Sequence, residues 1–171
     1  MYLGEILRRF ILYLHKEKIF LNKLESLPNE IKTQYGIDTA LMSKCESDPS
    51  ESEFENAKNI LVDDLKIDSS YVTDDDAKIL KWASKAIGTR AARLSACALA
   101  AVVETECDEN KDDINIGLDG SVIEFYPKFE SKIREALRIL IGTQSEERIK
   151  IGLAKDGSGV GGMFHNYNQL I

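Results

Sequence analysis

Near the amino terminus, apolar residues recur three and four positions apart, which is the spacing of one face of an α-helix. The pattern predicts an amphipathic helix from Tyr2 to Lys16. The same spacing predicts helices at Thr39–Glu46 and Phe54–Leu65. The segment between the first two carries Pro28 and Gly36, so we expect it to be irregular.

A longer helical pattern begins after Thr73 and continues through Ala98. The Thr73 hydroxyl can accept a hydrogen bond from an amide of the first turn, and the acids Asp74–Asp76 suit the positive end of the helix dipole. We therefore interpret these aspartates as a helix start rather than as metal ligands. Gly88 marks a point at which this helix can be interrupted.

After Asp113 the pattern changes to alternation. Apolar residues alternate with Asn and Gly over Ile114–Leu118, and a second apolar run covers Val122–Tyr126. Asp119–Gly120 between two such runs predicts a β-hairpin. Pro127 then opens a helical pattern, and Ile149–Leu153 predicts another strand. The chain is expected to be an α/β protein.

The composition narrows the function classes. The chain has 171 residues, enough for one domain with a real core, and a net charge of -7, which argues against non-specific nucleic-acid binding. Its three cysteines, Cys45, Cys97 and Cys107, indicate neither a disulfide framework nor a zinc site, and this favours a cytoplasmic location. We expect Cys97 to be a buried thiol. The longest apolar run, Ala96–Val103, is too short to span a bilayer.

One segment carries candidate chemistry. The sequence Asp-Gly-Ser-Gly-Val-Gly at Asp156–Gly161 follows the last predicted strand, where glycines would let a backbone approach a nucleotide closely. A plain flexible turn explains the same residues equally well. The segment is not a Walker A loop, because no Gly-Lys-Ser/Thr follows. His15 and His165 lack the spacing of a zinc site.

Four segments in a fixed order resemble those of eukaryotic hexokinases, and their wording is most like fungal glucokinase-type members. They are Met1–Arg8, Gly88–Ser95, Ile116–Pro127 and Leu153–Gly161. The resemblance covers residues 1–161 as part of the large, C-terminal hexokinase domain, and residues 162–171 form a divergent tail. This set of segments argues against an unrelated actin-like ATPase.

The resemblance implies the C-terminal portion of an actin-like (ribonuclease-H-like) ATPase fold, with a mixed sheet and flanking helices. It implies ATP-dependent 6-phosphorylation of a hexose such as glucose, at the entry to glycolysis, with Mg²⁺ bound to ATP rather than to a ligand identified in this chain. The implied sugar contacts are Glu25 and Asn22, the latter in place of the family's glutamine. The implied nucleotide contacts are Thr73, Gly157, Ser158, Gly159, Val160 and Gly161. A second family hydroxyl is replaced by Ala77.

The resemblance also implies what this chain does not contain. The small domain, the phosphate-binding turns and the catalytic aspartate of the family lie before the position of Met1. We therefore expect the chain alone to be inactive, with the remainder of a hexokinase chain missing. The alternative is a non-catalytic truncated paralogue or pseudoenzyme that still binds nucleotide. No membrane or nucleic-acid partner is expected.

Overall fold

The computed structural model describes residues 2–48, 54–106 and 113–153, and the chain divides into two units, Met1–Ala91 and Ala92–Ile171. Its elements are α1 (Tyr2–Lys16), α2 (Asn29–Lys32), α3 (Thr39–Glu46), α4 (Glu55–Asn59), a π-helical turn (Ile60–Asp64), a 3₁₀ turn (Ser69–Tyr71), α5 (Asp74–Glu106), β1 (Ile114–Leu118), α6 (Ser121–Phe125), α7 (Phe129–Ile141), α8 (Thr143–Glu147) and β2 (Ile149–Leu153). The helices predicted at residues 2–16 and 39–46 are confirmed with the same bounds. The helix predicted over residues 54–65 is present as α4 and the π-helical turn.

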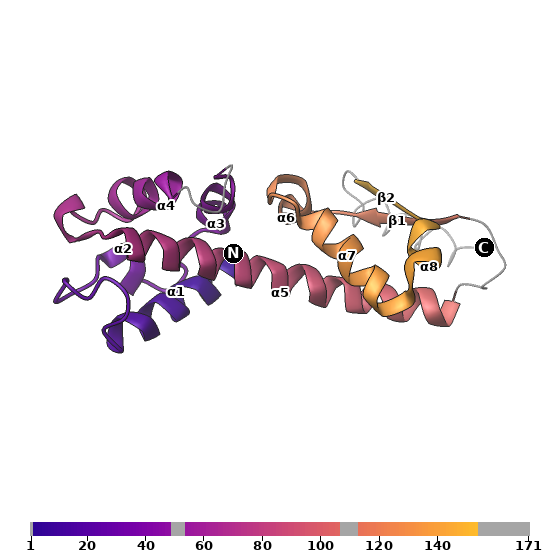
Figure 1. Ribbon diagram of the computed structural model, residues 1–171, viewed down its shortest axis with the longest axis horizontal. Helices are drawn as coiled ribbons and strands as arrows, with labels where there is room; N and C mark the ends of the chain where they lie inside the picture. The colour runs from indigo at the N-terminus through magenta and orange to yellow at the C-terminus, as the bar shows by residue number, and fades with distance from the viewer. Residues whose placement is uncertain (1, 49–53, 107–112, 154–171) are drawn as a thin grey trace, which may run out of the picture. The chain divides into compact units, whose positions relative to one another are not determined.

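The first unit is an assembly of helices. α1 contacts α2 and α3, and α3 contacts α4. Figure 1 shows these helices beside the first part of α5. Burying a large aliphatic or aromatic side chain contributes about 1.5–3 kcal/mol, so the apolar faces of these helices account for their association. The fully buried large side chains of this unit are Leu7, Ile11, Phe20, Leu21, Ile31, Ile37, Met42, Ile60, Leu61, Leu65 and Leu80.

A buried arginine joins α1 to α2. The Arg8 guanidinium donates to the Ile31 carbonyl oxygen at 3.0 Å and to both carboxylate oxygens of Glu5 at 2.6 Å. The hydrogen bond from Arg8 is the main cause that lowers the pKa of Glu5 to about 2. Glu5 also accepts a hydrogen bond from the Tyr35 amide at 2.8 Å. This network holds the carboxyl end of α2 against α1.

The loop after α1 is tightly packed rather than loosely attached. Phe20 and Leu21 are completely buried, while Lys18 and Leu21 have left-handed backbone angles, with φ of 58° and 49°. The Leu21 amide donates to the Asp76 carboxylate at 2.7 Å. Non-glycine residues adopt these angles only where the surrounding structure compensates for the strain, and here burial and the Asp76 contact do so.

Helix α5 is continuous from Asp74 to Glu106, so the interruption expected at Gly88 does not occur. Gly88 is buried, and a single glycine costs a helix only about 1 kcal/mol relative to alanine. By length and composition α5 is also the one helix in the described part of the chain that could cross a membrane. The core helix of a protein passes the same test, but only 28% of the apolar window of α5 is buried. The buried alanines of α5 are Ala77, Ala83, Ala92, Ala96 and Ala100.

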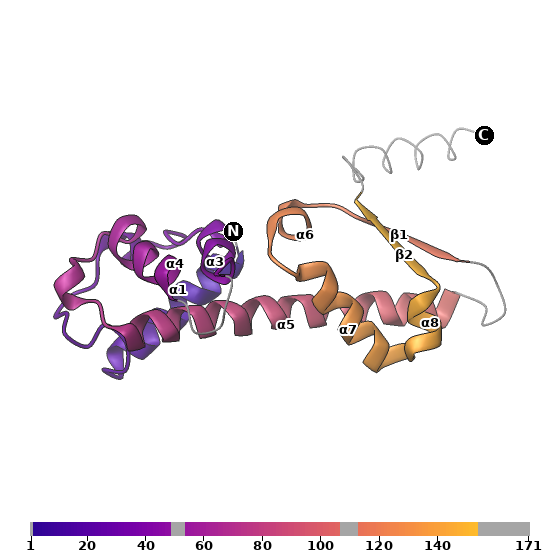
Figure 2. The ribbon, with the colours of Figure 1, turned by 45° about the horizontal axis from the view of Figure 1, so that its top comes forward.

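The second unit contains a two-stranded parallel sheet. β1 pairs with β2 in the register Ile114↔Ile149 to Leu118↔Leu153, and Figure 2 shows the strands side by side. The predicted hairpin is wrong for the described residues, because the run after Gly120 forms α6 instead of a strand. A five-residue apolar run fits a helical turn as well as a strand, so alternation alone could not decide.

The two cysteines in the described residues differ from each other. Burial raises the pKa of the Cys45 thiol to about 12, although a hydrogen bond with Ser84 acts in the opposite direction. Cys97 is exposed, contrary to the prediction of a buried thiol. The buried stripe of α5 passes through Ala96 and Ala100, which turns Cys97 away from the core.

Candidate functional site

The candidate nucleotide segment follows the carboxyl end of a parallel strand. Leu118 of β1 and Leu153 of β2 are paired, so both strands end at the same edge of the sheet. Gly120, which follows β1, has a φ of 119°, an angle that favours glycine. The carboxyl edge of parallel strands is where open α/β sheets bind ligands. Asp156–Gly161 itself, with Gly157, Ser158, Gly159, Val160 and Gly161, lies outside the described residues.

Thr73 caps α5 as predicted. Its Oγ1 accepts a hydrogen bond from the Asp76 amide at 3.2 Å, and its own amide donates to Asp76 Oδ2 at 2.9 Å. The Thr73 hydroxyl also donates to Asp76 Oδ2 at 2.5 Å. This reciprocal arrangement is a capping box. The hydroxyl that the resemblance assigns to nucleotide binding therefore already has a structural function.

The exposed aspartates beside Thr73 at the start of α5 form ion pairs with lysines. Asp74 forms an ion pair with Lys58 at 2.7 Å, and the hydrogen bond from Lys58 lowers the pKa of Asp74. Asp75 is paired with Lys78 at 3.0 Å. The lysines near Thr73 are thus paired with carboxylates at the start of α5 rather than left for a phosphate. Ala77 is completely buried and faces the core.

Asn22 and Glu25 line one hollow of about 430 Å³ in the first unit. Both are exposed, and in the described part of the chain no hydrogen bond or ion pair holds the Glu25 carboxylate. The hollow is also lined by Leu24 and by four basic side chains, His15, Lys16, Lys18 and Lys23. The structure thus brings the two residues together, while the assignment of a sugar to them stays a prediction.

No cluster of three or more His, Cys, Asp or Glu side chains that could hold a metal ion occurs within residues 2–48, 54–106 and 113–153. The aspartates at the start of α5 are occupied by the cap and by lysines, which agrees with their interpretation as a helix start.

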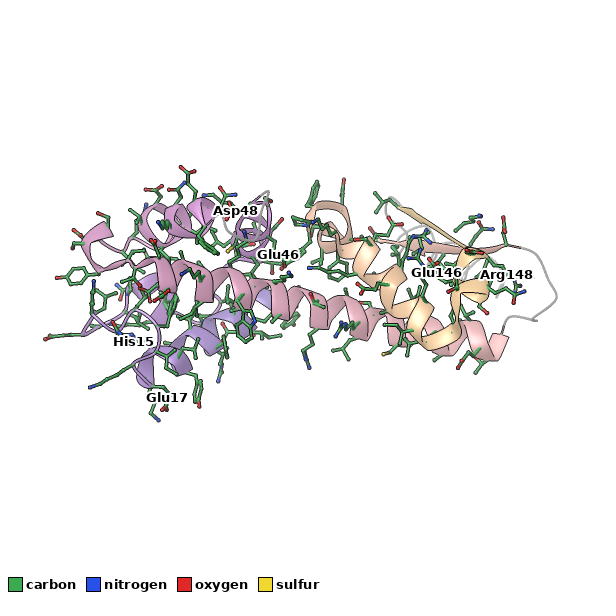
Figure 3. All side chains as sticks on the ribbon, in the orientation of Figure 1. His15, Glu17, Glu46, Asp48, Glu146 and Arg148 are labelled. Carbon is green, nitrogen blue, oxygen red and sulfur yellow. The ribbon has the colours of Figure 1, made fainter. Side chains whose placement is uncertain are left out.

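A buried polar cluster links the segment after α3, the start of α4 and α5, and the sequence patterns did not reveal it. Lys81 Nζ lies 3.6 Å from Asp48 Oδ2, and the backbone amide of Asn56 donates to Asp48 Oδ1 at 3.2 Å. The Lys81 ammonium also lies over the Phe54 ring, 5.5 Å from its centroid. Figure 3 labels Asp48 and its neighbour Glu46. Lys81 and Asp48 form an ion pair, but Asp48 Oδ2 makes no hydrogen bond.

Glu146 is the second buried acid that pattern reasoning missed. It is 1% exposed and lies 2.9 Å from Arg134 Nη1 and 2.8 Å from Arg138 Nε. Burial raises the Glu146 pKa, but the hydrogen bonds from the two arginines outweigh it, and the net shift is downward. Arg134 and Arg138 stand four residues apart on α7, a helical spacing that could have indicated a shared partner.

Comparisons with known proteins agree with one another. The family model described as "Hexokinase" matches residues 1–164. Glucokinase from Aspergillus niger is 45% identical over 172 aligned positions, and Hexokinase-2 from Schizosaccharomyces pombe is 39% identical over 162. Each alignment covers 94% of this chain. The solved hexokinase from Schistosoma mansoni, complexed with glucose, superposes with a TM-score of 0.79 at 30% identity and covers 94% of this chain.

The alignments cover nearly all of this chain but only a part of each relative. The alignments take in 34% of the Aspergillus protein, 33% of the Schizosaccharomyces protein and 34% of the Schistosoma chain. The present chain therefore spans about a third of the length of the relatives it matches. Within that third, the helices and the small parallel sheet have the fold of the C-terminal hexokinase domain, and this chain belongs to the hexokinase family.

Proposed function

We propose that this chain forms the nucleotide-side part of an ATP-dependent hexose kinase, and that it contacts the nucleoside end of ATP. The observation that carries the proposal is the paired carboxyl ends of β1 and β2, after which the glycine segment Asp156–Gly161 begins. The family match over residues 1–164 supports it.

In this proposal the reaction transfers a phosphoryl group from ATP, with Mg²⁺, to a hexose hydroxyl. Such chemistry requires positioning, stabilisation of charge and exclusion of water more than covalent participation of the protein. The glycines from Gly157 to Gly161 permit close backbone approach to the nucleoside, and Thr73 stands at the start of α5. Hexose and ATP are the proposed small-molecule partners, and the cytoplasm is the proposed location.

The test is calorimetric titration of the 171-residue chain with MgATP. We expect saturable binding that weakens by about tenfold when Gly157 and Gly159 are both replaced by valine, because Cβ branches would occupy the space of the ligand. Gly152→Ala serves as a control, since an added Cβ there meets nothing within 4 Å. Binding that the double replacement leaves unchanged would exclude the glycine segment.

Glucose-dependent formation of ADP, measured in the same preparations, tests whether the chain alone transfers a phosphoryl group. The resemblance places the catalytic aspartate outside this sequence, so we expect nucleotide binding without turnover. Turnover by the chain alone would contradict the inactive assignment and the non-catalytic alternative together. Absence of ATP binding in the folded chain would contradict the proposed nucleotide function.

A further inference from the structure

The part of α5 that belongs to the second unit has two faces that differ in burial. One face lies in the core and consists of Ala92, Ala96, Ala100 and Val103. The opposite face is exposed and consists of Leu94, Cys97, Ala98, Ala101, Val102 and Thr105. The members of each set stand three or four positions apart, which is the spacing of one side of a helix. Among the described residues, this part of α5 is therefore covered on one side.

The exposed face is apolar, although the water-facing side of a helix is normally polar. Leu94 is 54% exposed and Val102 is 58% exposed. The apolar window of α5 is 28% buried, so most of its apolar surface has no cover within the described residues. Contiguous apolar surface of this kind marks a place where another molecule binds.

The two ends of this face carry opposite charges. Arg93 stands at its amino end and Glu104 at its carboxyl end, and both side chains are exposed. Neither forms an ion pair with another residue in the described part of the chain. They are separated by about three helical turns, so they lie on the same flank of α5 and cannot reach each other within one helix.

A second copy of the same face complements this distribution of charge. When two copies of a helix pack antiparallel about a two-fold axis, the amino end of each lies against the carboxyl end of the other. Arg93 of each copy then lies beside Glu104 of the other copy, on the same flank, so the favourable pair occurs twice. A parallel arrangement would bring like charges together, and flanking charges of this kind determine the orientation of paired helices. The alanines between Leu94 and Val102 permit close approach of the two helices.

We propose that the chain forms a symmetric dimer in which the exposed face of α5 packs antiparallel against the same face of a second copy. Cys97 is exposed and lies near the middle of the face, so the Cys97 thiols of the two copies lie close to the two-fold axis. The contact involves about four helical turns of each chain, which makes it a small interface. We therefore expect weak association, with a Kd on the order of 10 µM.

The experiment uses the 171-residue chain with Cys107→Ser, which leaves Cys45 and Cys97. Cys45 is buried and Cys97 is exposed, so a thiol crosslinker reports on Cys97. Sedimentation under reducing conditions measures the Kd, and a short bismaleimide measures the proximity of the two thiols. We expect covalent dimers above the Kd and few at a tenth of that concentration. Cys97→Ser should abolish crosslinking and retain the dimer in sedimentation. Neither readout depends on nucleotide binding at the glycine segment.

Charge reversal tests the antiparallel orientation. Arg93→Glu and Glu104→Arg are each expected to raise the Kd by about tenfold, because each places like charges together at both ends of the contact. The two changes combined should restore the Kd of the wild type, since the pairs are formed again with the charges exchanged. Glu104→Arg does not weaken α5 itself, because a positive charge suits the carboxyl end of a helix. Glu135→Arg, at an exposed position of α7, is the matched control and should leave the Kd unchanged.

The apolar part of the contact is tested at Leu94. Leu94→Lys places a charge in the middle of the interface, and we expect it to raise the Kd by more than tenfold. Leu140→Lys provides the control, because Leu140 is 45% exposed on α7 in the same unit. Circular dichroism verifies the helix content of each variant. Should Leu94→Lys lose helix content, the combined charge reversal decides.

Three outcomes would overturn the proposal. One is a chain that sediments as a monomer at about 100 µM, ten times the expected Kd. In that case slow modification of Cys97 by a maleimide would indicate that another segment of this chain covers the face. The second is a dimer whose Kd the Leu94 and charge variants leave unchanged, because association would then use another surface. The third is a monomer that cosediments with phosphatidylcholine vesicles unless Leu94 is replaced by lysine, which would identify a lipid surface as the occupant.

Discussion

The carboxylate of Asp76 accepts hydrogen bonds from the amides of Thr73 and Leu21 and from the Thr73 hydroxyl. Asp76→Asn removes the negative charge and replaces one of the two carboxylate oxygens with an NH₂ group, which donates hydrogen bonds instead of accepting them. We expect a loss of about 2–3 kcal/mol in the free energy of unfolding, because buried amides would lose a charged acceptor. Urea denaturation followed by circular dichroism measures this loss.

Asp75→Asn is the matched control for that measurement. Asp75 stands on the same helical turn, is exposed and makes one surface ion pair with Lys78. Such a change is expected to alter stability by no more than about 0.5 kcal/mol. Equal effects of the two substitutions would show that Asp76 contributes only to the helix dipole.

Gly4 allows α1 to approach the segment before α3. A Cβ at this position would overlap the carbonyl oxygen of Ile37, and backbone atoms cannot move aside easily. Gly4→Ala is therefore expected to lower the thermal midpoint, at a cost of about 1–3 kcal/mol, whereas Gly152→Ala, in open space, should change it little. A Gly4 variant as stable as the wild type would mean that α1 can shift without loss.

At this scale the sequence predicted Thr73 as a cap, since the signal lies within four consecutive residues. It did not predict that Asp76 holds Leu21, because the partner is distant in the chain and a backbone amide has no sequence signature. Cys97 was misplaced for a related reason. In an alanine-rich stretch most positions are equally apolar, and the buried stripe cannot be chosen from composition.

Helices α7 and α8 and strand β2 are joined by Glu146 through Arg134 and Arg138. Arg134 also donates to the Ile149 carbonyl oxygen at 3.3 Å. Glu146→Gln removes the anion paired with Arg138 and leaves Arg134 with Glu130 alone, and we expect a loss of about 3 kcal/mol in the stability of this unit. Hydrogen exchange of the α7 and β2 amides measures it.

Glu147→Gln provides the control, since Glu147 is adjacent in sequence but exposed. It should leave exchange rates almost unchanged. Similar acceleration in both variants would indicate that general electrostatics, and not the pairing of Glu146 with the arginines, stabilises α8.

Acid should destabilise the first unit through Glu5. Its pKa falls from 4.5 to about 2 in the folded chain, mainly because of the hydrogen bond from Arg8. A lowered pKa contributes stability that is present above the unfolded value and is lost as pH falls toward the folded one. Between about pH 4.5 and pH 2, the denaturation midpoint of wild type should therefore fall more steeply than that of Glu5→Gln. Parallel curves would contradict this explanation.

At the element scale, long helices were predictable and strand pairing was not. The bounds predicted for α1 and α3 from the spacing of apolar residues were correct. The partner of β1 lies beyond α6, α7 and α8, so no local signal identifies it. An Asp-Gly turn signal predicts a hairpin only where the second run is a strand, and the residues after Gly120 form α6.

The whole molecule exposes many large apolar side chains. Trp82, the only tryptophan, is 62% exposed beside Phe10, and Ile139, Phe125 and Leu153 are exposed further along the chain. The chain spans about a third of the length of its hexokinase relatives, so we expect such surfaces to make it prone to association.

The fluorescence of Trp82 gives a direct measurement of the expected association. In dilute solution its fluorescence should be typical of a water-exposed indole and readily quenched by iodide. At higher concentration we expect emission to shift to shorter wavelength as the indole becomes covered, with sedimentation showing larger species. Sedimentation as a monomer at every concentration would contradict the expected association.

Family membership was predictable from the sequence because four ordered segments together are far more specific than any one of them. The nucleotide contacts assigned to Asp156–Gly161 stay a prediction, since this segment lies outside the described residues. The basic hollow beside Asn22 and Glu25 was not predictable. Its lysines are dispersed between the end of α1 and the loop, and only the fold gathers them.

The parallel pairing of Ile114 with Ile149 also determines the order in which the second unit can fold. A hairpin closes within a few residues, but these strands meet only after the chain has crossed back through three helices. Loop closure is an entropic cost incurred before any strand contact forms, so pairing waits until α7 and α8 shorten the path. During synthesis β1 emerges well before its partner, and through that interval its backbone remains available to other strands.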